Sequence, residues 1–330
     1  MISSVEITRF RGIREGKLED LTPLVVLVGP NGCGKSSILD ALYIAANSDP
    51  GDAIPRVVER HPGVNDGPRW LFWRAGQQSP AETVVHTTKG SQSHCRLHLQ
   101  RASSGWAISW RVECKTGKAS SSGRGDVQFH RDGKLESTAS GIAFREIPSV
   151  RFLHGDSDTT APLHQLYSES RRTGRRGETK GLIVELIPAV EDLEILTEGN
   201  SPVLYFVYKE GAIPAALAGD GIYALVHVAL ELAACAGGLV LLEEPEVHQH
   251  PGAIRQTMRA ILAAVRRDIQ VILTTHSLEL IDCLLAESSD EDIEKLSLYR
   301  LELQDGLLIS RRLPGSEVEF SRTEVEKDLR

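Results

Sequence analysis

Residues 29–36 read Gly-Pro-Asn-Gly-Cys-Gly-Lys-Ser. It has the spacing G-x-x-x-x-G-K-S and stands between an apolar run, Leu24–Val28, and a segment with helical periodicity, 36–47. Glycines let backbone N–H groups curl around phosphate oxygens, and the N-terminus of the following helix adds a positive field. The loop therefore predicts an ATP site in which Lys35 reaches the terminal phosphates and the Ser36 hydroxyl ligates Mg²⁺.

Short apolar strands alternate with amphipathic helices at both ends of the chain. Val5–Phe10 and Leu24–Val28 read as strands near the N-terminus. In the last third, the apolar runs Leu239–Glu243 and Gln270–Leu273 are separated by residues 254–265, which have apolar side chains at helical spacing. This alternation is typical of a mostly parallel sheet covered by helices. The sequence therefore predicts an α/β P-loop fold with a mostly parallel core sheet.

The middle of the chain has a different pattern. Residues 50–76 are rich in Pro and Gly and predict irregular loop. Residues 82–144 contain short alternating stretches between turns, which predict an antiparallel β region. Residues 119–125, rich in Ser and Gly, predict a mobile hairpin tip. Residues 156–198 read as a mainly helical, polar insert.

Two hairpins complete the organisation, one over residues 203–215 and one around the Asp305-Gly306 turn near the C-terminus. We therefore predict three parts. Residues 1–155 form an ATPase lobe with the P-loop and the β meander, residues 156–215 form a helical insert, and residues 216–330 form a second ATPase lobe.

The bulk composition favours a cytoplasmic protein without a membrane segment. The 330 residues are 41% hydrophobic, no apolar run is long enough to cross a bilayer, and the N-terminus lacks a signal-peptide pattern. Five cysteines without a C-x-x-C pair indicate neither a disulfide framework nor a zinc ribbon. The net charge of −8 argues against a surface that coats nucleic acid broadly. One basic cluster, Arg171, Arg172, Arg175 and Arg176, is interpreted either as a solvated helix end or as a contact for a DNA backbone.

Two adjacent acids, Glu243 and Glu244, end the apolar run that starts at Leu239. Such a pair can be an ordinary strand end. In P-loop ATPases, however, the first acid holds magnesium, and the second can act as a general base that polarises the attacking water. We therefore predict Ser36 and Glu243 as magnesium ligands and Glu244 as the catalytic base.

His276 follows the next buried strand, in the sequence Thr274-Thr275-His276-Ser277. An imidazole at this place can hydrogen-bond the terminal phosphate and couple its loss to movement, so we predict a catalytic sensor role for His276. Cys33 has no identified base partner, which argues against a catalytic thiol. His248 and His250 have the i, i+2 spacing of metal ligands but lack further His or Cys partners nearby, which argues against a zinc site.

Taken together, these blocks resemble the ABC-type ATPases of the SMC, RecF and OLD (overcoming-lysogenization-defect) group. The resemblance rests on residues 7–13 (ITRFRGI), 28–42 (VGPNGCGKSSILDAL), 217–221 (LAGDG), 242–251 (LEEPEVHQHP) and 273–277 (LTTHS). It implies the fold of an ABC ATPase head, with ATP and Mg²⁺ as ligands. It also implies that ATP is sandwiched between one protomer's P-loop and the signature motif of the partner, so that binding closes a dimer. The residues expected at the nucleotide are Arg11, Pro30, Asn31, Gly32, Cys33, Gly34, Lys35, Ser36, Ser37, Gly219, Asp220 and Gly221.

Three positions depart from the family pattern. Glu243 stands where most relatives have Asp, Ala218 replaces the hydroxyl of the transporter-like signature, and Asp220 adds negative charge where phosphate would dock. The change at Glu243 affects the geometry of the metal site, and the changes at Ala218 and Asp220 affect ATP-driven closure of the dimer. Asp220 has an alternative role as a helix cap.

The tail after His276 is too short for a Toprim nuclease domain, and the middle is too short for the long heptad runs of SMC proteins. The chain thus resembles compact ATPases found beside an effector gene in bacterial anti-phage systems. We expect a homodimeric or larger ATPase that controls a separate nuclease or toxin. The alternatives are a RecF-like DNA-repair ATPase and a non-hydrolysing, ATP-gated scaffold.

Overall fold

The structure, a computed structural model, describes residues 1–60, 66–76, 79–103, 105–141, 147–154, 162–172, 174, 176–235, 237–247 and 249–330. Arg175, His248 and the predicted boundary at residues 155 and 156 lie outside the described residues. The side chain of Asp220 is also outside the description.

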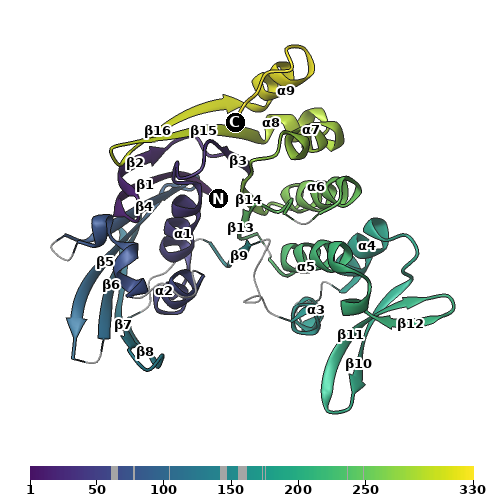
Figure 1. The fold of residues 1–330 in the computed structure, drawn as a ribbon, viewed down its shortest axis with the longest axis horizontal. Helices are drawn as coiled ribbons and strands as arrows, with labels where there is room; N and C mark the ends of the chain where they lie inside the picture. Colours follow the sequence, from purple (N-terminus) through teal and green to yellow (C-terminus); the bar gives the residue numbers. More distant parts are fainter. Residues whose placement is uncertain are drawn as a thin grey trace.

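Within the described residues, thirteen strands form one large sheet (Figure 1). Their spatial order is β8 (Leu135–Ser140), β7 (Ala119–His130), β6 (Gly105–Thr116), β5 (Ser91–Ala102), β4 (Ala81–Thr87), β1 (Ile2–Phe10), β2 (Ile13–Leu18), β16 (Leu307–Pro314), β15 (Leu296–Gln304), β3 (Leu24–Val28), β14 (Gln270–Thr274), β13 (Leu239–Glu243) and β9 (Val150–His154).

The five neighbouring strands from β15 to β9 are all parallel. Every residue of β3, β13 and β14 is buried, because helices cover both faces of this part of the sheet. The predicted parallel core is therefore confirmed. The C-terminal hairpin is confirmed as well, since β15 and β16 pair antiparallel across the turn at Asp305.

Strands β4 to β8 form an antiparallel meander, as predicted. The predicted mobile tip at residues 119–125 is wrong, because these residues belong to β7 and pair with β6 along its length. Gly125 does not form a turn; glycine is needed at this position because a side chain would not fit. A Cβ at this position would lie 2.8 Å from the Trp110 ring and 2.0 Å from the Thr138 carbonyl oxygen.

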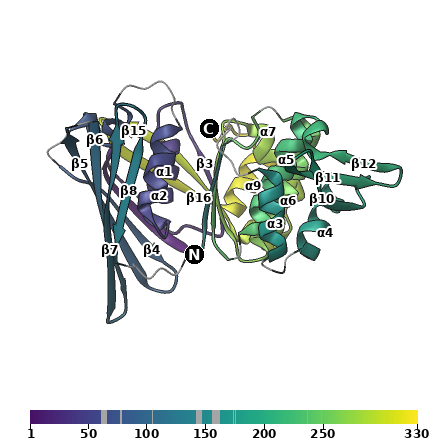
Figure 2. The same ribbon diagram turned by 90° about the horizontal axis from the view of Figure 1, so that it is seen from below.

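Helices cover the two faces of the sheet (Figures 1 and 2). On one face, alternate residues of β3, Val25 and Leu27, pack in a core with α1 (Lys35–Ala46) and α2 (Pro50–Glu59). On the other face, Leu24, Val26 and Val28 pack in a second core. The helices of that second side are α3 (Leu163–Arg172), α4 (Arg176–Leu186), α5 (Asp220–Ala234), α6 (Pro251–Val265) and α7 (Leu278–Glu287).

The prediction of irregular loop over residues 50–76 is wrong for its first part, which forms α2. Pro50 stands in the first turn, where its missing N–H costs nothing, and the Asp49 side chain accepts a hydrogen bond of 2.7 Å from the Gly51 N–H. Ala53, Ile54 and Val57 bury the apolar side of the helix. The short 3₁₀ helices η1 (Gly67–Leu71) and η2 (Trp73–Ala75) follow.

The insert combines the helices α3 and α4 with a three-stranded antiparallel sheet that projects from the body in Figure 1. Its strands are β10 (Asp192–Glu198), β11 (Ser201–Tyr208) and β12 (Gly211–Pro214). The hairpin predicted over 203–215 is confirmed as β11 and β12, which η3 (Ala215–Leu217) follows. The helical prediction is wrong at 192–198, where the alternating residues of β10 pair with β11.

Two further helices, α8 (Asp290–Glu294) and α9 (Gly315–Thr323), flank the terminal hairpin in sequence. None of the helices in the described part of the chain is both long and apolar enough to cross a membrane. The division into three parts stays a prediction, and strands of its first and third parts alternate within the one large sheet.

Candidate functional site

Three adjacent parallel strands deliver the predicted catalytic segments to one edge of the sheet. The strand before the P-loop, β3, neighbours β14, which precedes His276, and β14 neighbours β13, which ends at Glu243. The carboxyl ends of parallel strands meet at the same edge, which is where open α/β sheets bind their ligands. The structure therefore brings together the segments that the sequence predicts to act on ATP.

The P-loop depends on glycine at its first and last turns. Gly29 has φ 144°, and a Cβ there would lie 2.4 Å from the Leu301 carbonyl oxygen. Gly34 has φ 98° and is the N-cap of α1. The buried Lys35 donates from Nζ to the carbonyl oxygens of Gly29 (2.8 Å) and Pro30 (3.2 Å), so its ammonium lies against the loop itself. Ser36 is exposed at the start of the helix.

The acid pair divides into one buried and one accessible carboxyl. Glu243 is buried at the end of β13, whereas the side chain of Glu244 is 37% exposed. Glu244 has a left-handed backbone with φ 45°, and its N–H donates to the carbonyl and hydroxyl oxygens of Thr274 at 3.1 and 3.2 Å. This rare conformation for a non-glycine residue turns the chain at the strand end and fixes where Glu244 points.

His276 faces the predicted base. Its Nε2 lies 3.6 Å from Oε1 of Glu244. Partial burial lowers the pKa of His276, the positive charges of Lys35 and Arg330 lower it further, and Glu244 opposes them. The imidazole is therefore held neutral at pH 7, a state in which it can donate one hydrogen bond and accept another.

Glu246 is a site residue that the sequence analysis did not assign. Its Oε1 accepts hydrogen bonds from the Thr275 hydroxyl (2.5 Å) and from the His276 N–H (3.2 Å). Burial raises the pKa of Glu246, and these hydrogen bonds oppose the rise. Glu246 thus ties the turn after the acid pair to the loop that carries His276. Its position two residues after Glu244 is the signal that could have identified it.

Arg11, predicted to contact the nucleotide, takes part in a buried ion-pair network. Its Nε lies 2.8 Å from Oδ2 of Asp40, and its Nη2 donates to the Val57 carbonyl oxygen at 3.2 Å. Arg60, at the C-terminal end of α2, forms ion pairs with both Asp40 and Glu243. A nucleotide contact by Arg11 would require it to leave these partners, and that role stays a prediction.

The donor set suits magnesium rather than a metal held by protein alone. In the described ranges, no group of three or more His, Cys, Asp and Glu side chains could hold a metal ion. Magnesium commonly takes one or two protein ligands together with substrate phosphates and water. The hydroxyl of Ser36 and the carboxylate of Glu243 are hard oxygen donors of that type, so these residues fit the ion.

The signature segment Gly219-Asp220-Gly221 opens α5. Gly219 has φ 92° and is the N-cap of the helix. Helix α5 contacts α3, α4 and α6, which cover the sheet face opposite to α1. Within one protomer, the signature and the P-loop therefore belong to different faces of the sheet.

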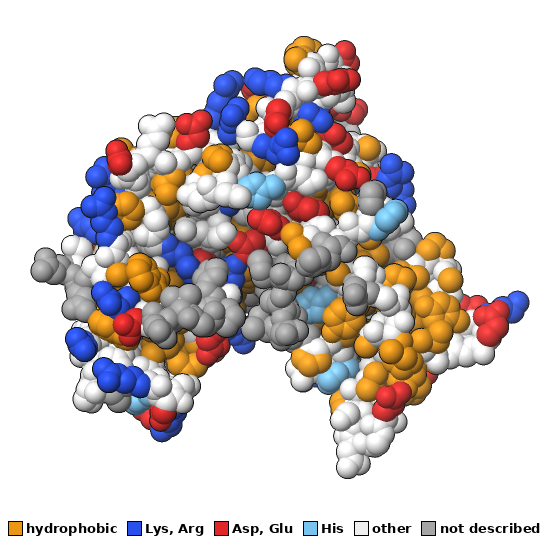
Figure 3. Space-filling model, in the orientation of Figure 1, with side chains coloured by type: hydrophobic (Ala, Val, Ile, Leu, Met, Phe, Trp, Pro, Cys, Tyr) orange, Lys and Arg blue, Asp and Glu red, His pale blue; other side chains and the backbone are white. Residues whose placement is uncertain are grey.

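Exposed apolar side chains gather beside the signature. Leu217 is 74% exposed, Ile213 47% and Tyr223 38%. Figure 3 shows hydrophobic side chains concentrated on the part of the surface that carries β11, β12 and the start of α5. We call Ile213, Leu217 and Tyr223 the signature patch. Such a cluster on a surface is typical of a contact site.

The basic cluster lies at the junction of α3 and α4. Arg171 and Arg172 end α3 and are exposed, and Arg176 starts α4. Arg176 lies 3.5 Å from Oδ2 of Asp192 on β10, so part of its charge is compensated within the chain. A DNA contact at this cluster stays a prediction.

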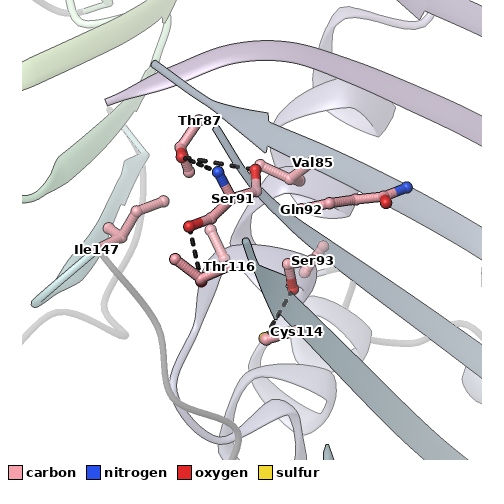
Figure 4. Close-up of a pocket in the computed structure, with 10 residues that line it drawn as sticks. Val85, Thr87, Ser91, Gln92, Ser93, Cys114, Thr116 and Ile147 are labelled. Carbon is pink, nitrogen blue, oxygen red and sulfur yellow. Dashed lines mark hydrogen bonds between the residues drawn. The ribbon is translucent and has the colours of Figure 1, made fainter. Parts of the chain in front are cut away.

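The pocket in Figure 4 is not a nucleotide site. It has a volume of about 30 Å³ and is lined by Val85, Ser91, Cys114 and Ile147, among others. That volume matches one water molecule. The hydroxyls of Ser91 and Thr116 are joined at 2.8 Å, so the polar groups at its wall bond each other.

Two family models match different parts of the chain. The model described as "AAA ATPase domain" matches residues 1–92, and the model described as "AAA domain, putative AbiEii toxin, Type IV TA system" matches residues 126–282. The first match covers the P-loop, and the second covers the signature, the acid pair and His276. Both are therefore consistent with the residues that form the site.

Curated relatives are similar over different lengths. An uncharacterised protein of Methanocaldococcus jannaschii, MJECL11, is 34% identical over 93 residues, which are 28% of this chain and 82% of the relative. An "ATP/GTP phosphatase" of Helicobacter pylori is 20% identical over 97% of both chains. The "DNA replication and repair protein RecF" of Acholeplasma laidlawii is 44% identical over 48 residues, 14% of each chain.

Solved structures share the fold. An SMC head domain bound to the C-terminal winged-helix domain of ScpA matches with a TM-score of 0.54 at 13% sequence identity. The match covers 95% of this chain and 98% of that one. The chain thus has the fold of an SMC-type ATPase head.

Proposed function

We propose that this chain, which is a P-loop ATPase of the SMC and RecF type, binds ATP with magnesium, hydrolyses it and works as a nucleotide-gated dimer in the cytoplasm. The observation that carries the proposal is the meeting of the P-loop, Glu244 and His276 at the ends of three adjacent strands. Each segment would have a separate role in holding ATP, activating water and sensing the terminal phosphate.

For hydrolysis, the backbone N–H groups of residues 30–36 and the Lys35 ammonium would hold the phosphates, as in other P-loops. Magnesium, when bound by Ser36 and Glu243, would neutralise charge that develops on the phosphate oxygens. Glu244 would accept a proton from the attacking water. The neutral His276 has one N–H, which would donate a hydrogen bond to the terminal phosphate beside Glu244.

Dimerisation is supported by the location of the signature segment. Because α5 and α1 cover opposite faces of the sheet, the signature that meets a P-loop in the proposed dimer would come from the second copy of the chain. The signature patch of Ile213, Leu217 and Tyr223 would then be buried, and its apolar character supports such a contact. A larger oligomer built from these dimers is compatible with the same contact.

We further propose that nucleotide-dependent closure controls a separate effector protein, a nuclease or a toxin, in anti-phage defence. The match to a family described with a toxin of a toxin–antitoxin system supports an effector-linked role. The partial match to a RecF protein favours a second candidate, a DNA-repair ATPase that would use Arg171, Arg172, Arg175 and Arg176. A third candidate is a scaffold that binds ATP without hydrolysing it, since Glu243 and Ala218 depart from the family pattern.

The mass of the protein in solution tests the dimer. We expect wild type and Glu244→Gln to be monomeric without nucleotide. With Mg-ATP, Glu244→Gln should double in mass and stay dimeric, whereas wild type should return to monomer as ATP is consumed. Leu217→Arg, which puts a charge on the signature patch, should prevent the dimer. If the mass of every variant is the same with and without ATP, the proposal of nucleotide-gated dimerisation is contradicted.

A further inference from the structure

Arg60 joins the two elements that carry the predicted magnesium ligands. It caps the C-terminal end of α2, and its side chain is 10% exposed. Nη1 donates to Oδ1 of Asp40 on α1, and Nη2 donates to Oε2 of Glu243 at the end of β13. One guanidinium therefore spans two carboxylates that belong to different parts of the core.

Asp40 connects this bridge to the P-loop. It stands four residues after Ser36 on α1, and residues at this spacing lie on the same face of a helix. The Asp40 side chain is fully buried and also pairs with Nε of Arg11 at 2.8 Å. Arg60 thus links the helix that begins with one predicted magnesium ligand, Ser36, to the other ligand, Glu243.

The surroundings keep Arg60 in place. Its Cζ lies 4.2 Å from the centroid of the Phe152 ring on β9, a cation–π contact. A guanidinium stays charged at neutral pH. The two arginines Arg11 and Arg60 balance the two acids Asp40 and Glu243, which is the condition for four charges to be buried together.

We propose that Arg60 is a positioning residue for the magnesium ion: its guanidinium holds α1 and β13 together so that Ser36 and Glu243 meet the ion at a fixed separation. The inference rests on the proposed ATP binding and deepens it. A glutamate at position 243 reaches one methylene farther than an aspartate, and the contact with Arg60 removes the rotational freedom which that extra bond brings. Carboxylates that ligate metals are commonly held by such outer hydrogen bonds.

Arginine suits this role and lysine does not. The planar guanidinium presents several N–H donors in a fixed fork and can serve two carboxylates at once, whereas an ammonium is a compact point charge. Arg60→Lys therefore keeps the charge that Asp40 and Glu243 need but loses the bridge. Arg60→Gln loses both. Together these variants separate positioning from charge balance.

The test compares binding of a fluorescent ATP analogue over a magnesium titration with binding in EDTA. We expect Arg60→Gln and Arg60→Lys to raise the magnesium concentration at half-saturation by about 10- to 100-fold, the usual loss when an outer hydrogen bond to a metal ligand is removed. Binding in EDTA should stay as in wild type, because the P-loop itself is unchanged. The matched control is Arg255→Gln, which should behave as wild type. It removes an exposed arginine on α6 that pairs with Glu287 on α7.

The outcomes distinguish this inference from the function on which it rests. If wild type shows magnesium-stimulated binding and both Arg60 variants keep its midpoint, or bind magnesium more tightly, the positioning role is overturned and ATP binding stands. If wild type binds no nucleotide, the proposed function fails and the positioning role fails with it. Thermal unfolding checks that each variant is folded. If Arg60→Gln does not fold, the magnesium midpoint of Arg60→Lys decides whether Arg60 has the positioning role.

Discussion

The imidazole Nε2 of His276 lies 3.6 Å from Oε1 of Glu244, although the two residues follow different strands of the sheet. The pair forms because β13 and β14 are parallel neighbours and because the left-handed backbone of Glu244 turns its side chain toward the next strand end. A proton acceptor for water and a donor for phosphate therefore lie side by side.

The first prediction concerns the sensor. His276→Ala removes the hydrogen bond expected at the terminal phosphate, so ATP turnover should fall by about 10²- to 10³-fold, the usual effect of losing one such donor. ATP should still bind, because Lys35 and the loop glycines remain. Turnover and nucleotide affinity measured on the same preparation check this. Loss of affinity with an unchanged rate would assign His276 to binding instead.

The second prediction concerns Glu246, which holds the sensor loop. Glu246→Ala leaves the buried Thr275 hydroxyl and the His276 N–H without their acceptor. An unsatisfied buried polar group costs about 1–3 kcal/mol, so the free energy of unfolding should fall by that amount, and turnover should fall because His276 is misplaced. Denaturant unfolding measures the first effect. Glu319→Ala, which removes an exposed acid on α9, is the control and should leave both quantities unchanged.

The third prediction follows from a buried acid outside the site. Glu231 on α5 has a pKa raised to about 7 by burial, and Arg151 at 3.6 Å opposes the rise only in part. The folded state therefore holds a proton that the unfolded state releases near pH 4.5, so stability declines as pH rises from about 4.5 to 7. Above pH 7, the ionisation of Glu231 lowers the free energy of unfolding by about 3 kcal/mol.

Glu231→Gln removes this titration while keeping the side-chain shape. The variant should be more stable than wild type at pH 8, and this advantage should shrink as pH falls toward 5. Melting temperatures across that range provide the measurement. An equal pH dependence in the two proteins would show that Arg151 keeps Glu231 ionised throughout.

The sequence predicts the parallel core and the order of the catalytic segments because both depend on local signals. An apolar strand, a glycine loop and a helix are contiguous at residues 24–46, and the acid pair directly ends β13. The antiparallel region is also predictable from its alternation. Residues 119–125 are not, because Ser and Gly favour turns locally, whereas here Gly125 makes room for Trp110 on the neighbouring strand.

The parts of the site that depend on contacts between residues far apart in the sequence could not be predicted from the sequence. Arg60 lies in a segment rich in Pro and Gly, and only the fold of α2 brings it to Glu243, which is 183 positions away. Glu246 is near the acid pair, yet its role depends on hydrogen bonds to a loop on the next strand. Pairings of this kind are decided by tertiary packing, which residue spacing does not encode.

The rate of phosphate release from ATP by Glu244→Gln tests whether Glu244 is the catalytic base. ATP binding is measured on the same protein, and Lys35→Ala serves as the reference that cannot bind. If Glu244 is the base, the variant should bind Mg-ATP as wild type does and release phosphate about 10²- to 10⁴-fold more slowly. Phosphate release at the wild-type rate would contradict the assignment of Glu244 and the catalytic arrangement built on it.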